Sequence, residues 1–538
     1  MKVKYYLLLL FLFGVAVTYG QKQDGLIKIE GQIFNSLDRT PVEGVDIAAE
    51  GVEKSVTSDK EGRFVISVPL KTNVLHLKAV DFHTKVITLA GQKQIKVFLV
   101  PLSVKGYSEM VTLPFKTVRF EDHTGSTAIV YSQDFDRGRV FADEMMIGNI
   151  PGVQTLQKGG MPGEGNFFRI RGTRSLIGSN MPLVVIDGMP VIPDTKSSSV
   201  FTGYSKNVLR NISLKEINQL SVAKGYDAVP YGSMASNGVL VINTDRATDM
   251  ETKVEFETVN GVSLLPREIP VLDATEYRDY LNRIAQTVLS QEDIYTAFPF
   301  LKNDPSYGIS YYAYNHNTNW QKEVFSPAFS TENILKVKGG DAIAKYSLLA
   351  GYMRNGGIED NTQSDRYFAR FNGDMQMNRK MTMFANVGFN YYDNKLHEQG
   401  LIKEINPMLT ALLKPSVLAP MRVDKYGRPM AAWDPVREFG VSNPAVVVKD
   451  VEGTNALYNI MVDMGLNYAF TPSLKLQGLI GINYDYTREK LFVPGVTTES
   501  IVHMEGGKAK NMIRNGVGKS MTYHANLNLS YEHNFKNG

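Results

Sequence analysis

The sequence predicts a mostly β protein: an immunoglobulin-like β-sandwich, then an α/β domain, then an incomplete antiparallel transmembrane β-barrel. Three observations support this fold class: short turn-bounded strands before residue 100, buried strands mixed with short helices from 128 to 245, and long alternating segments after 250. Close-spaced short strands indicate a sandwich, and alternation over about ten residues with aromatic ends is typical of barrel strands. We expect about eight of the roughly 22 strands found in barrels that enclose a domain.

The composition excludes several classes of protein. A formal charge of +3 over 538 residues is too small to indicate a nucleic-acid-binding protein. The absence of cysteine excludes thiolate metal sites, disulfides and lipid attachment at a cysteine. The eight histidines are scattered, and no nucleophile elbow or positioned acid–base pair is present. We therefore expect no enzyme, no metal and no cofactor.

The N-terminus has the features of a secretory signal peptide covering residues 1–20. Lys2 and Lys4 form a basic region, residues 5–17 are apolar, and small residues at 18 and 20 precede Gln21. A short N-terminal membrane anchor is the alternative. No later stretch approaches the roughly 18 consecutive apolar residues of a spanning helix. An exported chain of this kind that sits in a membrane must do so as a barrel.

Residues 21–100 form the predicted sandwich, with regularly spaced strands and polar turns. The segment resembles the carboxypeptidase-regulatory-like domain at Gly31, Pro41, Gly44, Val45, Asp59, Gly62 and Phe64. A periplasmic accessory module and a passive spacer remain equally open as its role.

Residues 101–127 lose the strand periodicity and collect Pro, Gly, Ser and Thr, which indicates a linker. Within it, "SEMVTLPF" at 108–115 is a short extended apolar segment with an acidic start. Such a segment can add as a strand to a partner's sheet edge, although an ordinary loop is the alternative.

The predicted α/β domain, residues 128–248, contains four short phrases that together point to one family. They are Ile150-Pro151-Gly152-Val153, Arg169-Ile170-Arg171-Gly172, Val185-Ile186-Asp187-Gly188, and Tyr231-Gly232 with Asn237-Gly238-Val239. Their order and spacing resemble the plug of TonB-dependent outer-membrane transporters, in particular the SusC-like branch, which also carries the upstream sandwich. A phosphate-binding loop at 159–165 is the rival interpretation, but that stretch lacks the Gly-Lys-Ser/Thr ending.

Arg169 and Arg171 are candidates for holding such a plug in place. A plug in a wet lumen needs polar contacts that can be released, and arginines form bidentate pairs with carboxylates. We expect these two arginines to reach carboxylates on the barrel wall. Pairing within the plug itself is the alternative. The neighbouring strand, 183–186, supplies the core of the plug.

Residues 249–538 are predicted to form the partial barrel. In "RYFARFNGDMQM", at 366–377, apolar and small residues alternate with Arg370, Asn372, Asp374 and Gln376. Transmembrane barrel strands alternate in this way, and a large soluble β protein is the alternative. Long insertions at 265–331 and 397–455 include helical stretches at 274–291 and 403–413. They also hold aromatic residues that either stack on a substrate or pack within the loops: Tyr311, Tyr312, Tyr314, Trp320 and Trp433.

The family resemblance implies TonB-dependent active import of a large nutrient, an oligosaccharide or a peptide, across the cell outer membrane. The chain would be the N-terminal portion of the transporter, from a shortened sequence, a split gene or a degraded one. The implied partners are outer-membrane lipid, a TonB-type energy-transducing protein and a SusD-like lipoprotein lid, with the N-terminal domain in the periplasm. Glu109, Met110, Val111 and Thr112 match the family's coupling box only loosely. A non-transporting surface or periplasmic glycan-binding protein is the alternative function.

Overall fold

The computed structural model divides the chain into two compact units, residues 1–109 and 110–538. It describes residues 26–531 except 37–38, 50–51, 53–54, 70–71, 73, 90–91, 102–109, 113–116, 120–122, 124, 133–134, 136–140, 193–198, 248–250, 303, 342, 401, 438, 472, 495–501 and 503–510. The predicted signal peptide and Glu109 lie outside the described residues.

The first unit is a β-sandwich, as predicted. One sheet has the strand order β4-β1-β7 and the other β3-β2-β5-β6. Their bounds are β1 Leu26–Asn35, β2 Asp46–Ala49, β3 Val56–Thr57, β4 Arg63–Pro69, β5 Val74–Lys78, β6 Lys85–Thr88 and β7 Gln94–Leu99. Alternate residues such as Phe64, Ile66 and Val68 of β4 enter one buried core. The period of two therefore places one face of each strand in the core and the other in solvent.

The plug-like domain is built on a five-stranded mixed sheet of order β10-β15-β16-β13-β14. The strands are β10 Ser126–Tyr131, β13 Leu183–Ile186, β14 Met189–Val191, β15 Ile217–Lys224 and β16 Val239–Thr244, with a separate hairpin of β11 Val153–Leu156 and β12 Phe167–Ile170. All four residues of β13 are buried, and β13 runs parallel to β16. The run at 183–186 is thus a buried strand in the core of this domain, as predicted.

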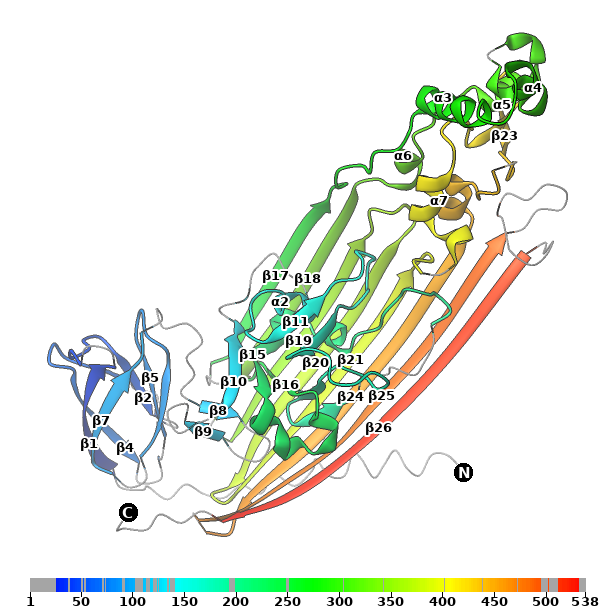
Figure 1. The fold of residues 1–538 in the computed structure, drawn as a ribbon. Helices are drawn as coiled ribbons and strands as arrows, with labels where there is room; N and C mark the ends of the chain where they lie inside the picture. Colours follow the sequence, from blue (N-terminus) through cyan, green and yellow to red (C-terminus); the bar gives the residue numbers. More distant parts are fainter. Residues whose placement is uncertain are drawn as a thin grey trace, which may run out of the picture. The chain divides into compact units, whose positions relative to one another are not determined.

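Eight long strands form the third part, an open antiparallel sheet that we call the barrel sheet. Each strand pairs with the next, and β17 and β26 are its two edges. The strands are β17 Lys253–Ser263, β18 Ala328–Gly340, β19 Ala344–Gly356, β20 Gln363–Asn378, β21 Met381–Lys395, β24 Glu452–Ala469, β25 Leu474–Pro494 and β26 Asn511–Tyr531. Figure 1 shows the plug-like elements lying against one face of this sheet. The predicted partial barrel of about eight strands is confirmed.

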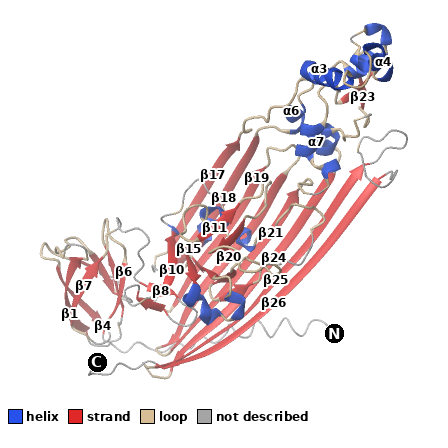
Figure 2. Ribbon diagram, viewed as in Figure 1, coloured by secondary structure: helices blue, strands red, loops and turns tan. Residues whose placement is uncertain are grey.

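The two ends of the barrel sheet differ in their connections. Short turns join β18 to β19, β20 to β21 and β24 to β25, whereas long insertions join β17 to β18 and β21 to β24. Transmembrane barrels have short periplasmic turns and long outer loops. We call the end of the barrel sheet with the short turns the short-turn end, and the opposite end, with the long insertions, the long-loop end. Helices gather beyond the long-loop end (Figure 2).

The two faces of the barrel sheet carry different side chains, in the predicted alternation. On β20, Tyr367 and Phe371 are exposed on one face, while Arg366 and Asn372 are buried against the plug on the other. The face turned away from the plug also carries a row of tyrosines in register across five neighbouring strands, which are Tyr352, Tyr367, Tyr391, Tyr458 and Tyr486. Their ring centroids lie 4.6–6.1 Å apart from strand to strand. This row is an aromatic girdle near the long-loop end.

The loop insertions at 265–331 and 397–455 fold into a small helical lobe with its own core, which we call the loop lobe. The helices include α3 Ala274–Ala285, α4 Gln291–Ala297, α5 Ile309–Tyr314, α6 Trp320–Val324, α7 Pro407–Leu413 and α8 Pro444–Lys449. Asp273 begins α3 by accepting hydrogen bonds from the amides of Thr275 and Glu276. The predicted stretch 274–291 is helical as far as Ala285, where α3 ends, and the stretch 403–413 is a short 3-10 turn followed by α7.

No helix among the described residues is long and apolar enough to cross a membrane.

Candidate functional site

The plug-like domain meets the barrel sheet through a buried ionic cluster centred on Glu216. Glu216 ends a 3-10 turn, Leu214–Glu216, and its carboxylate accepts a hydrogen bond from the amide of Ser213 at 3.2 Å. Arg370 Nε donates to the same carboxylate at 2.7 Å, and Arg366 Nη2 does so at 3.4 Å. Glu216 is 4% exposed, Arg366 0% and Arg370 5%. One plug carboxylate is therefore shared by two guanidinium groups of β20.

The barrel sheet holds Arg366 in position. Arg366 donates from Nε and Nη2 to Asn390 Oδ1 on β21, at 3.1 and 2.7 Å. Its guanidinium carbon lies 4.1 Å from the centroid of the Phe368 ring, a cation–π contact. The Nη1 atoms of Arg366 and Arg370 are buried and have no hydrogen-bond partner among the described residues. The strands thus orient the cluster, but some of its hydrogen-bond donors have no acceptor there.

A second polar contact lies where β16 ends, nearer the short-turn end. Arg246 Nη1 pairs with Asp374 at 2.8 Å, and Arg246 Nη2 donates to Asn386 Oδ1 at 2.7 Å. Asp245 pairs with Lys336 and with Lys338 of β18. All these pairs join a plug residue to an inward-facing strand residue, so this contact repeats the polar character of the Glu216 cluster.

A third contact, near the long-loop end, is largely apolar. Phe201 is 1% exposed and packs with Leu396, Leu491 and other residues of the strands and loops. The flanking backbone is held by carboxylates, since Glu489 accepts from the amide of Val200 at 2.8 Å and Glu398 accepts from that of Thr202 at 2.9 Å. The plug is therefore attached by polar groups through its middle and inner parts and by an inserted phenylalanine at the outer part.

The expectation for Arg169 and Arg171 is not met in the described structure. Arg169 donates to Gln154 Oε1 at 2.8 Å and to Thr173 Oγ1 at 2.7 Å, and Arg171 donates to Ser126 Oγ at 3.1 Å. All these partners belong to the plug-like domain, which is the alternative stated above. Arg171 also lies beyond the end of β12, with φ of 56°. The contacts to the strands are made elsewhere, by Arg246 of the plug with Asp374 and by Glu216 of the plug with the strand residues Arg366 and Arg370.

The other plug-motif residues form turns around the sheet. Asp187 and Gly188, with φ of 49° and 91°, make the two-residue turn of the β13–β14 hairpin, and positive φ at both positions is the type I′ pattern. Asp187 accepts from Thr244 N and Oγ1 at 2.9 and 2.6 Å. Pro151 O accepts from Lys224 Nζ at 2.8 Å, and burial lowers the pKa of that lysine, with Arg171 adding to the effect.

The last motif group closes the domain at the other end of β16. Asn237 Nδ2 donates to Ser179 O at 2.7 Å and to Met181 O at 3.3 Å. Gly238 has φ of 91°, and an added Cβ would lie 2.7 Å from Ile170 Cδ1. Gly152, Gly172 and Gly232 also have positive φ, and burial raises the pKa of Tyr231. These residues therefore shape turns, and Tyr231 faces the cavity described below.

The candidate coupling segment is a short strand. Met110–Thr112 forms β8, which pairs antiparallel with β9 Thr117–Arg119 in a two-stranded sheet. Because β9 covers only one edge, the other edge of β8 has no strand beside it among the described residues. An extended segment with an open edge is the geometry that strand addition requires.

The loop aromatics are mostly packing residues. Tyr314 and Trp320 are 6% and 3% exposed in the core of the loop lobe, and Trp320 Nε1 donates to Pro415 O at 3.0 Å. Trp433 is half-buried and donates to Asp450 at 2.6 Å. Substrate stacking is therefore wrong for Tyr314 and Trp320. Tyr311 and Tyr312 are half-exposed and contact each other edge to face. Stacking on a substrate therefore stays a prediction for these two residues.

Sequence reasoning missed Glu216, Arg366 and the pairing of Arg370. A signal was present, because two arginines on the inward face of one strand are expensive to bury without a carboxylate. That partner lies 150 residues away along the chain from Arg366. No local pattern connects positions so far apart.

Comparisons with known proteins agree with this fold. The model of the TonB-dependent Receptor Plug Domain family matches residues 119–239. TonB-dependent receptor SusC of Bacteroides thetaiotaomicron is 27% identical over 335 residues, 62% of this chain and 30% of that protein. TonB-dependent receptor P26 of Formosa agariphila is 24% identical over 506 residues, 93% of this chain and 46% of that protein.

A solved structure of the RagAB peptide importer in its open-open state superposes with a TM-score of 0.60 and 19% identity, over 78% of this chain and 46% of that chain. The chain thus spans between 30% and 46% of the length of these three proteins. The matches place it in the outer membrane, with the plug toward the periplasmic side. The plug match, the similar receptors and the fold together support a SusC-like TonB-dependent receptor.

Proposed function

We propose that this chain is the plug-bearing part of an importer that moves a large nutrient, an oligosaccharide or a peptide, across the outer membrane. The observation that carries the proposal is the Glu216 cluster. It holds a folded domain against the inner face of barrel strands through ion pairs. Replacing a buried ion pair by well-packed apolar residues is often neutral or stabilising. A plug that never moved would therefore gain little from such pairs.

Movement of the plug requires a force applied at its N-terminal side. The open edge of β8 offers a place for a TonB-type protein to add a strand, and main-chain hydrogen bonds along that edge transmit the pull. The linker and β10 then connect the pull to the sheet of the plug. The sandwich sits in the periplasm, and a SusD-like lipoprotein covers the long-loop end. The similar fold of a solved peptide importer supports a peptide as the nutrient. The similarity to SusC supports a TonB-dependent receptor of the same group.

Replacement of Met110, Val111 and Thr112 by Gly-Ser-Gly tests the coupling role. We expect the variant to bind labelled substrate at the cell surface as the natural protein does, and to lose uptake. The physical reason is that the segment carries force but does not touch the long-loop end. Uptake of a labelled oligosaccharide or peptide mixture, compared with surface binding on ice, measures both properties.

The matched control replaces Leu102, Ser103 and Val104, which lie in the same linker, by the same tripeptide. This control should import normally. Normal import by the β8 variant would contradict the coupling assignment. Binding without any import by the natural protein would instead favour the non-transporting glycan-binding protein.

A further inference from the structure

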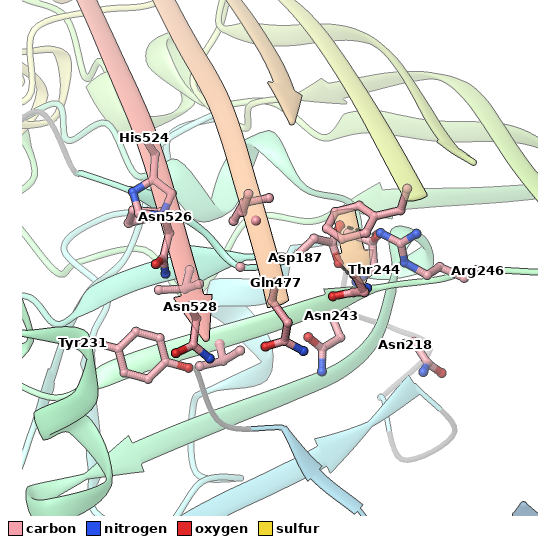
Figure 3. A pocket seen from close by; sticks show the side chains of 18 of the residues that line it. Asp187, Asn218, Tyr231, Asn243, Thr244, Arg246, Gln477, His524, Asn526 and Asn528 are labelled. Atoms are coloured by element: carbon pink, nitrogen blue, oxygen red, sulfur yellow. Dashed lines mark hydrogen bonds between the residues drawn. The ribbon is translucent and has the colours of Figure 1, made fainter. Parts of the chain in front are cut away.

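A cavity of about 710 Å³ lies between the plug and the barrel sheet at the short-turn end. Its plug side includes Asp187, Tyr231 and Asn243, and its strand side includes residues of β24, β25 and β26. Figure 3 shows Tyr231 and Gln477 directed into the same space as Asn526 and Asn528. The cavity lies apart from the Glu216 cluster and from the loop lobe, and nothing above assigns it a role.

The charged groups around this cavity are already paired. Asp187 accepts two hydrogen bonds from Thr244, Arg246 pairs with Asp374 at 2.8 Å, and Lys338 pairs with Asp245 at 2.5 Å. An anionic ligand would therefore find no free cation among the described lining residues, and a cationic one would find only the Asp187 carboxylate, which already accepts from Thr244. A buried charge without a partner is costly, so the cavity disfavours ligands that carry a negative charge, a terminal carboxylate included.

The free polar groups of the lining are neutral amides and rings. Six lining side chains make no hydrogen bond to another described residue, and they are Asn218, Tyr231, Gln477, His524, Asn526 and Asn528. An amide side chain offers one acceptor and two donor hydrogens, and a phenol offers one of each. Such a set complements groups that both donate and accept, as hydroxyls do. The ring of Tyr231 adds apolar surface for the C–H face of a sugar ring.

The backbone of the plug is adjusted at this cavity. The pairing of β15 with β16 shifts register between Ile217 and Gln219, which leaves Asn218 unpaired at a bulge. A bulge re-aims a side chain and is frequent beside functional sites. Asn218 is exposed and lines the cavity because of it. The register shift is a second observation, made on the backbone, that singles out this place.

We propose that this cavity is an inner binding site for a neutral, hydroxyl-rich solute, that is, for sugar residues that have passed the outer part of the plug. The inference rests on the proposed import function and adds to it a second site on the periplasmic side. Free amides of β25 and β26 replace the hydrogen bonds to water that the hydroxyls lose. A peptide with charged termini fits less well, because its terminal carboxylate would lose its hydration without gaining an opposite charge.

Single cysteines test this inference directly, since the chain has no cysteine of its own. In the full-length protein in detergent, Asn526→Cys places a thiol in the cavity. Thr522→Cys is the matched control, because Thr522 lies on the same strand and the same face but does not line the cavity. The measured quantity is the rate of labelling by N-ethylmaleimide, without and with maltotriose, xylotriose or mannotriose. Triglycine, which is zwitterionic, is the comparison ligand.

We expect at least one trisaccharide to slow labelling at Asn526→Cys, by about fourfold at a concentration about three times its Kd, as simple occupancy requires. Labelling at Thr522→Cys should not change, and triglycine should protect neither position. Lack of protection by every sugar overturns the site, and so does equal protection at Thr522→Cys. Equal protection by triglycine overturns the neutral-solute class. These outcomes are separate from a failure of import, which the natural protein reports in the uptake assay.

Discussion

At the residue scale, the sharing of Glu216 by two arginines makes it the most consequential contact between plug and strands. Removing one partner of a buried ion pair leaves an uncompensated charge, at about 3–5 kcal/mol, whereas an exposed pair contributes about 0–1 kcal/mol. We expect Glu216→Gln to loosen the plug and to raise the population of released plug at least tenfold, since about 1.4 kcal/mol is a factor of ten. Entry of a small hydrophilic antibiotic into cells measures this release.

Two control variants on this chain isolate the effect of the cluster. Glu257→Gln breaks the partly exposed pair of Lys215 with Glu257, which also joins plug to strand, and should leave permeability near that of the natural protein. Arg169→Ala with Arg171→Ala changes two arginines that bond only within the plug and should also leave it unchanged. Equal leakage in all three variants would mean that the cluster has no special part in retention.

At the element scale, the β13–β14 hairpin carries the motif that first pointed to the family. Gly188 has φ of 91°, and its added Cβ would also lie 3.2 Å from Leu479 Cδ2 on β25. A non-glycine residue in the left-handed region costs about 1–2 kcal/mol. We expect Gly188→Ala to speed hydrogen exchange of the hairpin amides about 5- to 30-fold, as local opening becomes easier.

Gly160→Ala is the control for that measurement, because Gly160 lies in a plug loop with no heavy atom within 4 Å of its added Cβ and no positive φ. It should leave exchange in the hairpin unchanged. Exchange by Gly188→Ala at the rate of the natural protein would show that the hairpin does not depend on the left-handed turn.

Elements were predictable from the sequence where a local period or turn chemistry specifies them. Strands such as β20 and β24 alternate with period two, and Asp187-Gly188 has the residues of a type I′ turn, so both appear in the sequence without structural help. The helix at 274–285 carries its own N-cap. The Glu216 cluster and the packing of Trp320 against Pro415 depend on residues about a hundred or more positions apart. Such pairings follow from topology, which one sequence does not display.

At the scale of the whole molecule, the two faces of the barrel sheet differ: one faces the plug, and the outward face has aromatic residues at two depths. The outward face of β24 carries aromatic residues at two depths, Tyr458 in the girdle and Tyr468, beside Phe470, at the short-turn end. At about 3.3 Å per residue and a tilt of about 45°, Tyr458 and Tyr468 lie about 23 Å apart along the membrane normal. That distance is close to the apolar band of about 25 Å in transmembrane barrels. Met464 lies between them on the same face.

This geometry predicts a depth-dependent cost for a charge on the outward face. Met464→Lys, near the middle of the band, should destabilise the protein in lipid vesicles by about 2–4 kcal/mol, whereas Tyr458→Lys at the girdle should cost about 0–1 kcal/mol from its charge. Guanidinium titration of the two variants in vesicles, followed by fluorescence, gives the difference. The inward-facing Asn467→Lys is a further comparison, because a lysine there reaches the polar cavity. A Met464→Lys protein no less stable than Tyr458→Lys would mean that lipid does not contact this face, and hence that the sheet does not cross the membrane in the orientation that its two faces indicate.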